Sequence, residues 1–440
     1  MYMEQLKLPL VFDDSESFEE MSLDEVAQVL SRTIVDDDIN KKTIFLAMLS
    51  AYTDKSQINI SINAPSSSGK TYLATQIAAL FPAEDKVERS GASPTSFFYE
   101  DGVIDEERGA KIVSLKRKIL IFHEQPNPEL QVRLRALLSH DSREIIHSLT
   151  NKGKGGRNKT DKIILEGFPA TIFCSAGMRL DEQEATRAIL ISPEATQAKI
   201  NASVSMQFER GGDEEKFAEM LESYEDRNGL MRRIVAIRDE HVNDIIIPDI
   251  AQVKARFLSN LPVLLPRHSR DTDHFLRLIK SLALLNVWYR RGPNGEIHAN
   301  AYDIEEAFKL WETFFETQNL NVPPAVLDIY KKYIKPAYIE KFLTSDKDFK
   351  LRMMNEEIGL TVQELLSYHL LTEGVSMNGE NLRKQMIPQL EQAGVIAFEK
   401  PEDGDKRSKH LYPKRFTDEE LNKLGRGGSG DKPGTIGDEW

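Results

Sequence analysis

The run Ala-Pro-Ser-Ser-Ser-Gly-Lys-Thr at residues 64–71 has the spacing of a phosphate-binding loop, with alanine in place of the usual first glycine. Backbone N–H groups of such a loop point inward at phosphates, while Lys70 can reach the β- and γ-phosphates and Thr71 can ligate Mg²⁺. A strand predicted at residues 58–62 precedes the loop and an apolar helix predicted at residues 71–81 follows it, which is the context that the motif requires. The sequence therefore predicts a site for ATP and Mg²⁺ built from Ala64, Pro65, Ser66, Ser67, Ser68, Gly69, Lys70 and Thr71.

A second candidate is the hydrophobic run at residues 119–122, which ends in His123 and Glu124. It resembles a Walker B strand, whose carboxylate can orient and deprotonate the attacking water beside the γ-phosphate. His123 stands where an aspartate usually supports the metal, yet a neutral imidazole can still accept a hydrogen bond from a metal-bound water. We expect Glu124 to be catalytic and His123 to lie behind the Mg²⁺. The alternative is a core strand that ends in exposed polar residues.

The next buried strand is predicted at residues 170–175, and Ser175 at its end is the polar residue closest to the expected γ-phosphate, as in a sensor 1. Arg187 precedes a further strand predicted at residues 188–192. Ring ATPases place there an arginine finger, which stabilises charge on the γ-phosphate of a neighbouring subunit. Arg179 is a competing candidate, and a surface ion pair is the alternative for either arginine.

A basic hairpin is predicted between the second and third of these strands. Residues 144–150 and 162–165 alternate apolar and polar side chains around a tip rich in glycine and lysine. The segment 143–162 carries six Lys or Arg and two acidic residues, a net charge of +4. Such a tip can follow phosphates without reading bases, although a flexible, solvated loop would look similar. The candidate DNA contacts are Lys152, Lys154, Arg157 and Lys159.

The order of these motifs resembles the AAA+ helicases of the minichromosome-maintenance and superfamily 3 type. Those families carry a hairpin before sensor 1 that grips DNA in the ring channel, which matches residues 136–159 here. Residues 267–278 look like the lid helix of the minichromosome-maintenance proteins, with Arg270 in the sensor 2 position at the nucleotide. The resemblance covers roughly residues 40–415. It departs from the family because the leader is too short for an oligonucleotide-binding or zinc domain, and no primase segment is fused.

The resemblance implies an α/β fold, with a P-loop AAA+ core around a parallel sheet, a helical lid and a C-terminal winged-helix domain. The expected segments are an acidic leader at residues 1–38, the core with its hairpin at 39–215, the lid at 216–335, the winged helix at 336–416 and a disordered tail at 417–440.

Within the expected winged helix, residues 361–369 form a first helix and residues 378–393 the recognition helix. Strands at residues 395–398 and 410–413 would flank a wing. Such modules enter a DNA groove in many proteins and bind only protein in others. Pro388 should kink or shorten the recognition helix. The candidate DNA contacts here are Arg383, Lys384, Lys406, Arg407 and Lys409.

Together these features predict a ring, a hexamer of this chain, that hydrolyses ATP and moves along single-stranded DNA during replication of a phage or mobile element. A separate primase, polymerase or initiator is an expected partner. The alternative is a non-translocating initiator or loader, an ATPase switch, which His123 in place of aspartate would suit. A small-molecule kinase would leave the basic hairpin without a role.

The composition sets the remaining limits. The 440 residues carry a net charge of −13, but residues 1–38 hold eleven acidic and two basic side chains, so the other residues carry only −4. The single cysteine, Cys174, permits no disulfide within the chain and is expected as a small buried residue in a reducing cytoplasm. The histidines show no spacing typical of zinc ligands. No apolar run approaches the roughly 20 residues that span a membrane, so no membrane partner is expected.

Overall fold

The computed structural model describes residues 18–91, 93, 95–152, 158–175, 186–259, 261, 263–355, 357–401 and 407–425, with backbone alone at 99, 149–152 and 158–161. The chain divides into two compact units. The first comprises Met1–Ala176, Gln183–Ile250 and Arg267–Thr313, and the second comprises Gly177–Glu182, Ala251–Pro266 and Phe314–Trp440.

A five-stranded parallel sheet forms the centre of the first unit, in the order β2-β5-β8-β1-β9. The inner strands are almost entirely buried, as expected for a sheet covered on both faces, and β1 alternates isoleucine with buried Asn59, Ser61 and Asn63. The α/β class and the four predicted strands are confirmed, whereas β2 was not predicted. The strands are β1 (Asn59–Asn63), β2 (Lys86–Arg89), β5 (Ile119–Phe122), β8 (Ala170–Ser175) and β9 (Ile189–Ile191).

The helices of this unit begin with the signals that the sequence contains. Ser22 and Glu25 form a reciprocal capping box at the start of α1. Asn127 caps α4, where proline occupies the first turn without losing a hydrogen bond. The other helices are mostly those predicted: α1 (Leu23–Leu30), α2 (Asp38–Leu49), α3 (Lys70–Ala78), α4 (Pro128–Leu138), α6 (Gln197–Gly212), α7 (Glu214–Ser223), α8 (Glu225–Asp239), α10 (His268–Leu285) and α11 (Ala301–Leu320).

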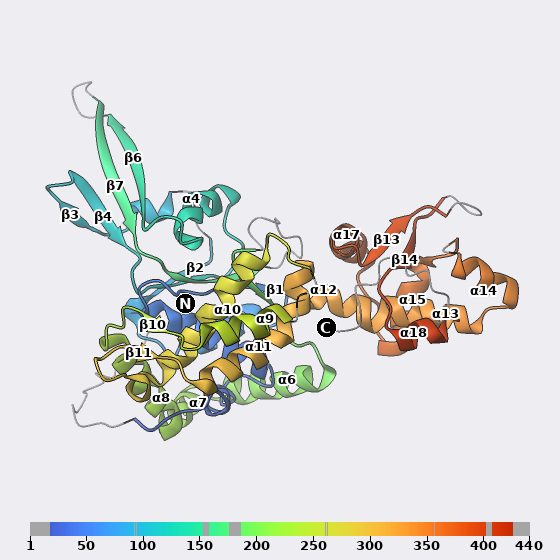
Figure 1. The fold of residues 1–440 in the computed structure, drawn as a ribbon, viewed down its shortest axis with the longest axis horizontal. Coiled ribbons are helices and arrows are strands. Elements are labelled where there is room, and N and C mark those ends of the chain that lie inside the picture. Colours follow the sequence, from blue (N-terminus) through green and yellow to red (C-terminus); the bar gives the residue numbers. More distant parts are fainter. Residues whose placement is uncertain are drawn as a thin grey trace. The chain divides into compact units, whose positions relative to one another are not determined.

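The predicted hairpin is confirmed. Strands β6 (Glu144–Lys152) and β7 (Asn158–Glu166) pair antiparallel along their whole length. They belong to a second sheet of order β3-β4-β7-β6, in which β3 (Val103–Asp105) and β4 (Ala110–Ser114) form a hairpin that was not predicted. Both hairpins project from the central sheet on the same side (Figure 1). A buried cluster that includes Phe98, Phe122 and Leu165 joins their base to α4 and the central sheet.

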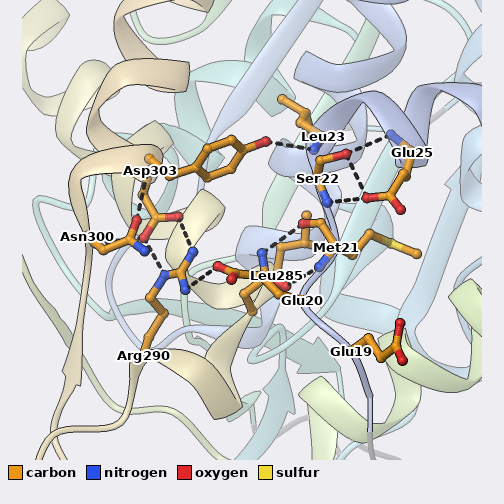
Figure 2. A network of polar contacts seen from close by, with 12 residues as sticks. Glu19, Glu20, Met21, Ser22, Leu23, Glu25, Leu285, Arg290, Asn300 and Asp303 are labelled. Carbon is orange, nitrogen blue, oxygen red and sulfur yellow. Dashed lines mark hydrogen bonds and ion pairs between the residues drawn. The ribbon is translucent and has the colours of Figure 1, made fainter.

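The chain just before α1 is fastened to the helices near residues 285–303 (Figure 2). The Asn286 side chain accepts from the N–H of Met21 and donates to its carbonyl, both at 2.8 Å. The buried guanidinium of Arg290 donates to Asp303 at 2.7 and 3.0 Å and to Glu20 at 2.6 Å. Breaking a buried charge pair of this kind strongly destabilises the fold, because one charge is then left without a partner.

The second unit holds short helices and a three-stranded antiparallel sheet of order β12-β14-β13 around its own apolar core. The predicted break at residues 323–324 is confirmed, since α11 ends at Leu320 and the next helix starts at Pro324. Pro388 interrupts the predicted recognition helix: a π-helical turn at Leu382–Met386 precedes the proline and accommodates its missing N–H. The elements are α12 (Pro324–Ile329), α13 (Lys335–Thr344), α14 (Lys347–Met354), β12 (Leu360–Thr361), α15 (Val362–Glu373), α16 (Gly379–Asn381), α17 (Ile387–Gln392), β13 (Ile396–Glu399), β14 (His410–Pro413) and α18 (Asp418–Lys423).

Candidate nucleotide site

The candidate phosphate loop runs from the carboxyl end of β1 to the first turn of α3. Two of its residues adopt left-handed backbone conformations, Ser67 at φ +64° and Gly69 at φ +83°. Such alternation turns successive N–H groups toward one concave side, where an anion can bind. At Gly69 the requirement is conformational, because a Cβ there would meet nothing within 4 Å. Pro65, Ser66 and Thr71 are exposed, as a loop that receives a ligand must be.

Lys70 lies inside this loop, with its Nζ 2.8 Å from the carbonyl of Ala64 and 2.6 Å from that of Pro65. The Ser68 hydroxyl is a further partner at 3.4 Å. The residue is only 8% exposed, and burial lowers the pKa of its ammonium. Among the residues that the structure describes, no carboxylate pairs with this ammonium. A buried cation held only by neutral oxygens fits an anionic phosphate, which would supply the missing charge.

Cys174 lies on β8 beside the loop, where its thiol forms a hydrogen bond with Thr71 and is near enough to Lys70 to feel its charge. Burial raises the pKa of this thiol to about 12, although Lys70 and Thr71 act in the opposite direction. The thiol therefore stays protonated near neutral pH and has no nucleophilic character. This agrees with the expectation of a small buried residue.

The strand order brings three candidates to one edge of the sheet. Because β8 lies between β1 and β5 and all three are parallel, their carboxyl ends meet at the same edge. Ser175 ends β8 and donates to Oε1 of Gln125 at 2.6 Å. Glu124 follows β5 and is exposed, so its carboxylate is free to meet a ligand or water. The loop, Ser175 and Glu124 thus share an edge, as their positions after predicted strands indicate.

His123 makes a contact that the sequence did not reveal. Its backbone N–H donates to the carbonyl of Arg89 at 2.9 Å, and its Nε2 lies 3.1 Å from Oε2 of Glu88 on β2. Its Nδ1 is buried and has no hydrogen-bond partner within the described part of the chain. Glu88 was missed because nothing in the short run at residues 86–89 marks it as a strand beside the acidic motif.

Arg187 and Arg270 lie at the opposite edge of the sheet. Arg187 precedes the amino end of β9, and its Nε donates to the Ser139 hydroxyl at 2.6 Å. Arg270 donates to the hydroxyl of Thr186, the residue before Arg187. The five residues of β1 span roughly 16 Å, so neither arginine reaches the phosphate loop of its own chain. Arg179 lies outside the described residues.

A buried histidine cluster lies behind these arginines. Arg277 of α10 donates to Nδ1 of His140 at 3.2 Å, and Nε2 of His140 donates to Oε1 of Gln57 at 3.1 Å. Burial, reinforced by the Arg277 charge, lowers the pKa of His140 to about 3 and that of His274 to about 4. Both rings are therefore neutral near pH 7. His140 also packs on Phe168 at the root of the hairpin, with ring centroids 4.4 Å apart.

The basic candidates on the hairpin lie near its tip. Lys152 pairs with Asn158, and Lys159 pairs with Asn151, in the last rungs of the ladder. Lys154 and Arg157 lie outside the described residues. At the other end of the hairpin, Arg108 forms a bidentate pair with Glu144 at 2.6 and 3.0 Å, which ties the two hairpins together.

In the second unit, Arg383 and Lys384 are exposed in the π-helical turn, and Lys384 pairs with Glu380 at 2.6 Å. Arg407 is exposed, and the ammonium of Lys409 lies 5.2 Å from the centre of the Phe398 ring. Lys406 lies outside the described residues.

The described residues contain no group of three or more His, Cys, Asp or Glu side chains that could hold a metal ion. They also contain no helix that is both long and apolar enough to cross a membrane. No protein-family model matches the chain, and no curated protein sequence matches it either.

Proposed function

We propose that this chain is an ATP-hydrolysing DNA helicase or translocase that works as a ring, a hexamer, in the replication of a phage or mobile element. One observation carries the proposal. The phosphate loop with Glu124 and the pair Arg187 and Arg270 occupy opposite edges of one sheet, so a complete hydrolytic site needs two copies of the chain. Closed rings satisfy this requirement for every subunit at once.

Within each site, Lys70 and the loop N–H groups bind the β- and γ-phosphates, and Thr71 offers a hydroxyl to Mg²⁺. The bound Mg²⁺ neutralises charge that develops on the phosphates. Glu124 accepts the proton of the attacking water, and Ser175, held by Gln125, orients that water or the γ-phosphate. Arg187 and Arg270 reach into the site of the adjacent subunit and stabilise the charge on its γ-phosphate.

The remaining elements fit the roles that the resemblance implies. Helices α8, α10 and α11 suit a helical lid over the core. In the second unit, helices α15 to α17 followed by the β13–β14 hairpin suit a winged helix. The β6–β7 hairpin projects from the core with lysines near its tip (Figure 1), as a contact to single-stranded DNA in the channel requires.

Arg187→Ala tests whether each hydrolytic site takes its arginine from the adjacent subunit. We expect hydrolysis to fall by about a thousandfold, the lower range for an arginine finger, while the affinity for ATP stays within twofold. Arg232→Ala is the matched control, because Arg232 is also partly buried and pairs with a side chain of its own chain at 2.6 Å. Full hydrolysis by Arg187→Ala would reject its role as a finger.

The DNA activity is tested by strand displacement on a forked duplex and by hydrolysis with and without single-stranded DNA. Lys152→Ala with Lys154→Ala should abolish the stimulation and the unwinding but leave basal hydrolysis. The control is Lys309→Ala with Lys332→Ala, which also removes two positive charges, from side chains that are each 61% exposed. If DNA changes nothing in the wild type or the hairpin variant, the translocase proposal fails.

The histidine at position 123, where a Walker B strand usually carries an aspartate, favours a second candidate, a non-translocating initiator or loader in which ATP acts as a switch. Without an aspartate at this position, hydrolysis slow enough for a switch is chemically reasonable. ATP-dependent binding to a replication origin without any unwinding would favour this alternative.

A further inference from the structure

Glu88 is an acidic residue of the nucleotide edge that has no role so far. It lies on β2, the edge strand next to β5, and its carboxylate contacts His123. A carboxylate at neutral pH can only accept hydrogen bonds. The Nε2 of His123 must therefore carry the hydrogen of this contact, and a neutral ring then leaves Nδ1 as an acceptor.

The register of the sheet shows which face His123 occupies. Strands β5 and β8 pair up to Phe122 and Phe173, and the backbone bond from His123 to Arg89 continues the ladder on the other side of β5, so the same register places His123 opposite Cys174. Opposite residues on neighbouring strands point to the same face of a sheet. The Cys174 thiol contacts Thr71 of the phosphate loop, so His123 is on the face of that loop, one strand away.

The two ring nitrogens are separated by Cε1, and their hydrogen-bond directions diverge by more than a right angle. With Nε2 turned toward Glu88 on β2, Nδ1 faces away from that carboxylate, and β8 and the phosphate loop lie on the other side of β5 from β2. This Nδ1 is buried and lacks a partner among the described residues. A buried polar atom without a partner is unfavourable, which indicates a hydrogen bond that a bound molecule completes.

We propose that Glu88 is a positioning residue of the nucleotide site: it holds the Nε2–H of His123 and so presents the unprotonated Nδ1 to a water bound to Mg²⁺. This inference rests on the proposed nucleotide site and deepens it. The pair supplies an acceptor through the ring and a negative charge behind the ring, the two properties that an aspartate at position 123 would combine. Carboxylate–imidazole pairs orient metal-bound groups in the same way elsewhere.

The test compares nucleotide binding with Mg²⁺ and with EDTA, using a fluorescent, non-hydrolysable ATP analogue. Glu88→Ala should weaken binding by about 10-fold with Mg²⁺, at the lower end for partners of this kind, and by less than twofold with EDTA. Glu100→Ala is the matched control, because Glu100 is similarly exposed and pairs with Arg89 of the same strand. It should change neither affinity.

A double-mutant cycle makes the test specific. In His123→Asp the acceptor and the charge are again on one side chain, so adding Glu88→Ala should cost less than twofold with Mg²⁺. If Glu88→Ala weakened nucleotide binding equally in the wild type and in His123→Asp, its role would be merely structural and the inference would be overturned. The same holds if the loss of affinity were equal with and without Mg²⁺.

A second readout needs no nucleotide. In protein with ¹⁵N-labelled histidine, the His123 ring should show the Nε2–H tautomer in the wild type and Glu100→Ala, and a mixture in Glu88→Ala. A ring with hydrogen on Nδ1 in the wild type would overturn the inference while leaving the ATPase proposal intact. A wild type that binds no nucleotide would overturn both.

Discussion

The two edges of the central sheet both carry basic side chains, but they hold them differently. At the carboxyl edge, Lys70 is buried, and backbone carbonyls of its own loop bind its ammonium. At the amino edge, Arg187 is half-buried and Arg270 is exposed, and the hydroxyls of Ser139 and Thr186 accept hydrogen bonds from them. A buried ammonium that is held by its own loop can bind only a phosphate that enters the same loop. A guanidinium that donates to a hydroxyl gains energy when it moves to a stronger, anionic acceptor, which a neighbouring subunit can present.

Mixing two inactive variants should give the largest effect. Lys70→Ala and Arg187→Ala should each lower hydrolysis by about a thousandfold alone. In a mixed ring, an Arg187→Ala subunit still offers its phosphate loop to the intact arginine of a Lys70→Ala neighbour. Equal mixing should therefore restore about a quarter of the wild-type rate if subunits assemble at random. Absence of recovery in rings shown to contain both variants would mean that the edges do not meet.

Lys70→Ala should also weaken ATP binding itself, by about 10- to 100-fold, the value of a hydrogen bond to a charged group. The measurement is titration with a labelled nucleotide. Lys86→Ala serves as the control, because Lys86 also donates to a carbonyl, that of Ala78 at 2.9 Å, with a pKa lowered by burial. If both substitutions weakened ATP binding equally, the loss in Lys70→Ala would reflect a less stable fold and not a lost contact to the nucleotide.

Arg270→Ala should lower hydrolysis by about 10-fold with unchanged ATP affinity, a smaller loss than for Arg187 because Arg270 is more exposed. In mixed rings the defect should appear in the subunit that faces the substituted arginine. An ATP affinity that falls in Arg270→Ala monomers would instead place this arginine at its own nucleotide.

A further effect concerns stability and pH. His140 and His274 are neutral when folded, with pKa values lowered to about 3 and about 4, whereas the unfolded chain protonates them below about 6.5. Their contribution is therefore complete above pH 6.5 and declines as the pH falls toward 4. The free energy of unfolding should drop by about 1.4 kcal/mol per pH unit for each histidine.

Denaturant unfolding between pH 7.5 and 4.5 measures this slope. His140→Gln should make the slope shallower, while His298→Gln, at a partly exposed histidine of the same unit, should leave it unchanged. A slope that is the same in all three proteins would show that other groups dominate the acid response.

Much of the nucleotide edge could be predicted because its signals are local. Each strand is a short run rich in apolar residues, and the functional residues lie at its end or in the loop that follows, so parallel pairing brings Lys70, Ser175 and Glu124 to one edge. The β6–β7 hairpin was predictable for a similar reason, since its two strands flank an obvious turn. The missed elements β2, β3 and β4 are three to five residues long and only partly buried, so their composition differs little from that of a loop.

The sequence by itself determined the loop of residues 64–71, the carboxylate at the end of the next motif, and the basic hairpin, because residue type and spacing within one segment define them. Only the tertiary structure decided that Glu88 touches His123 and that Arg270 joins Arg187 away from its own phosphate loop. These relations depend on which strands are neighbours and at which edge each one begins. Such pairings join residues 35 to 84 positions apart, and no local pattern encodes them.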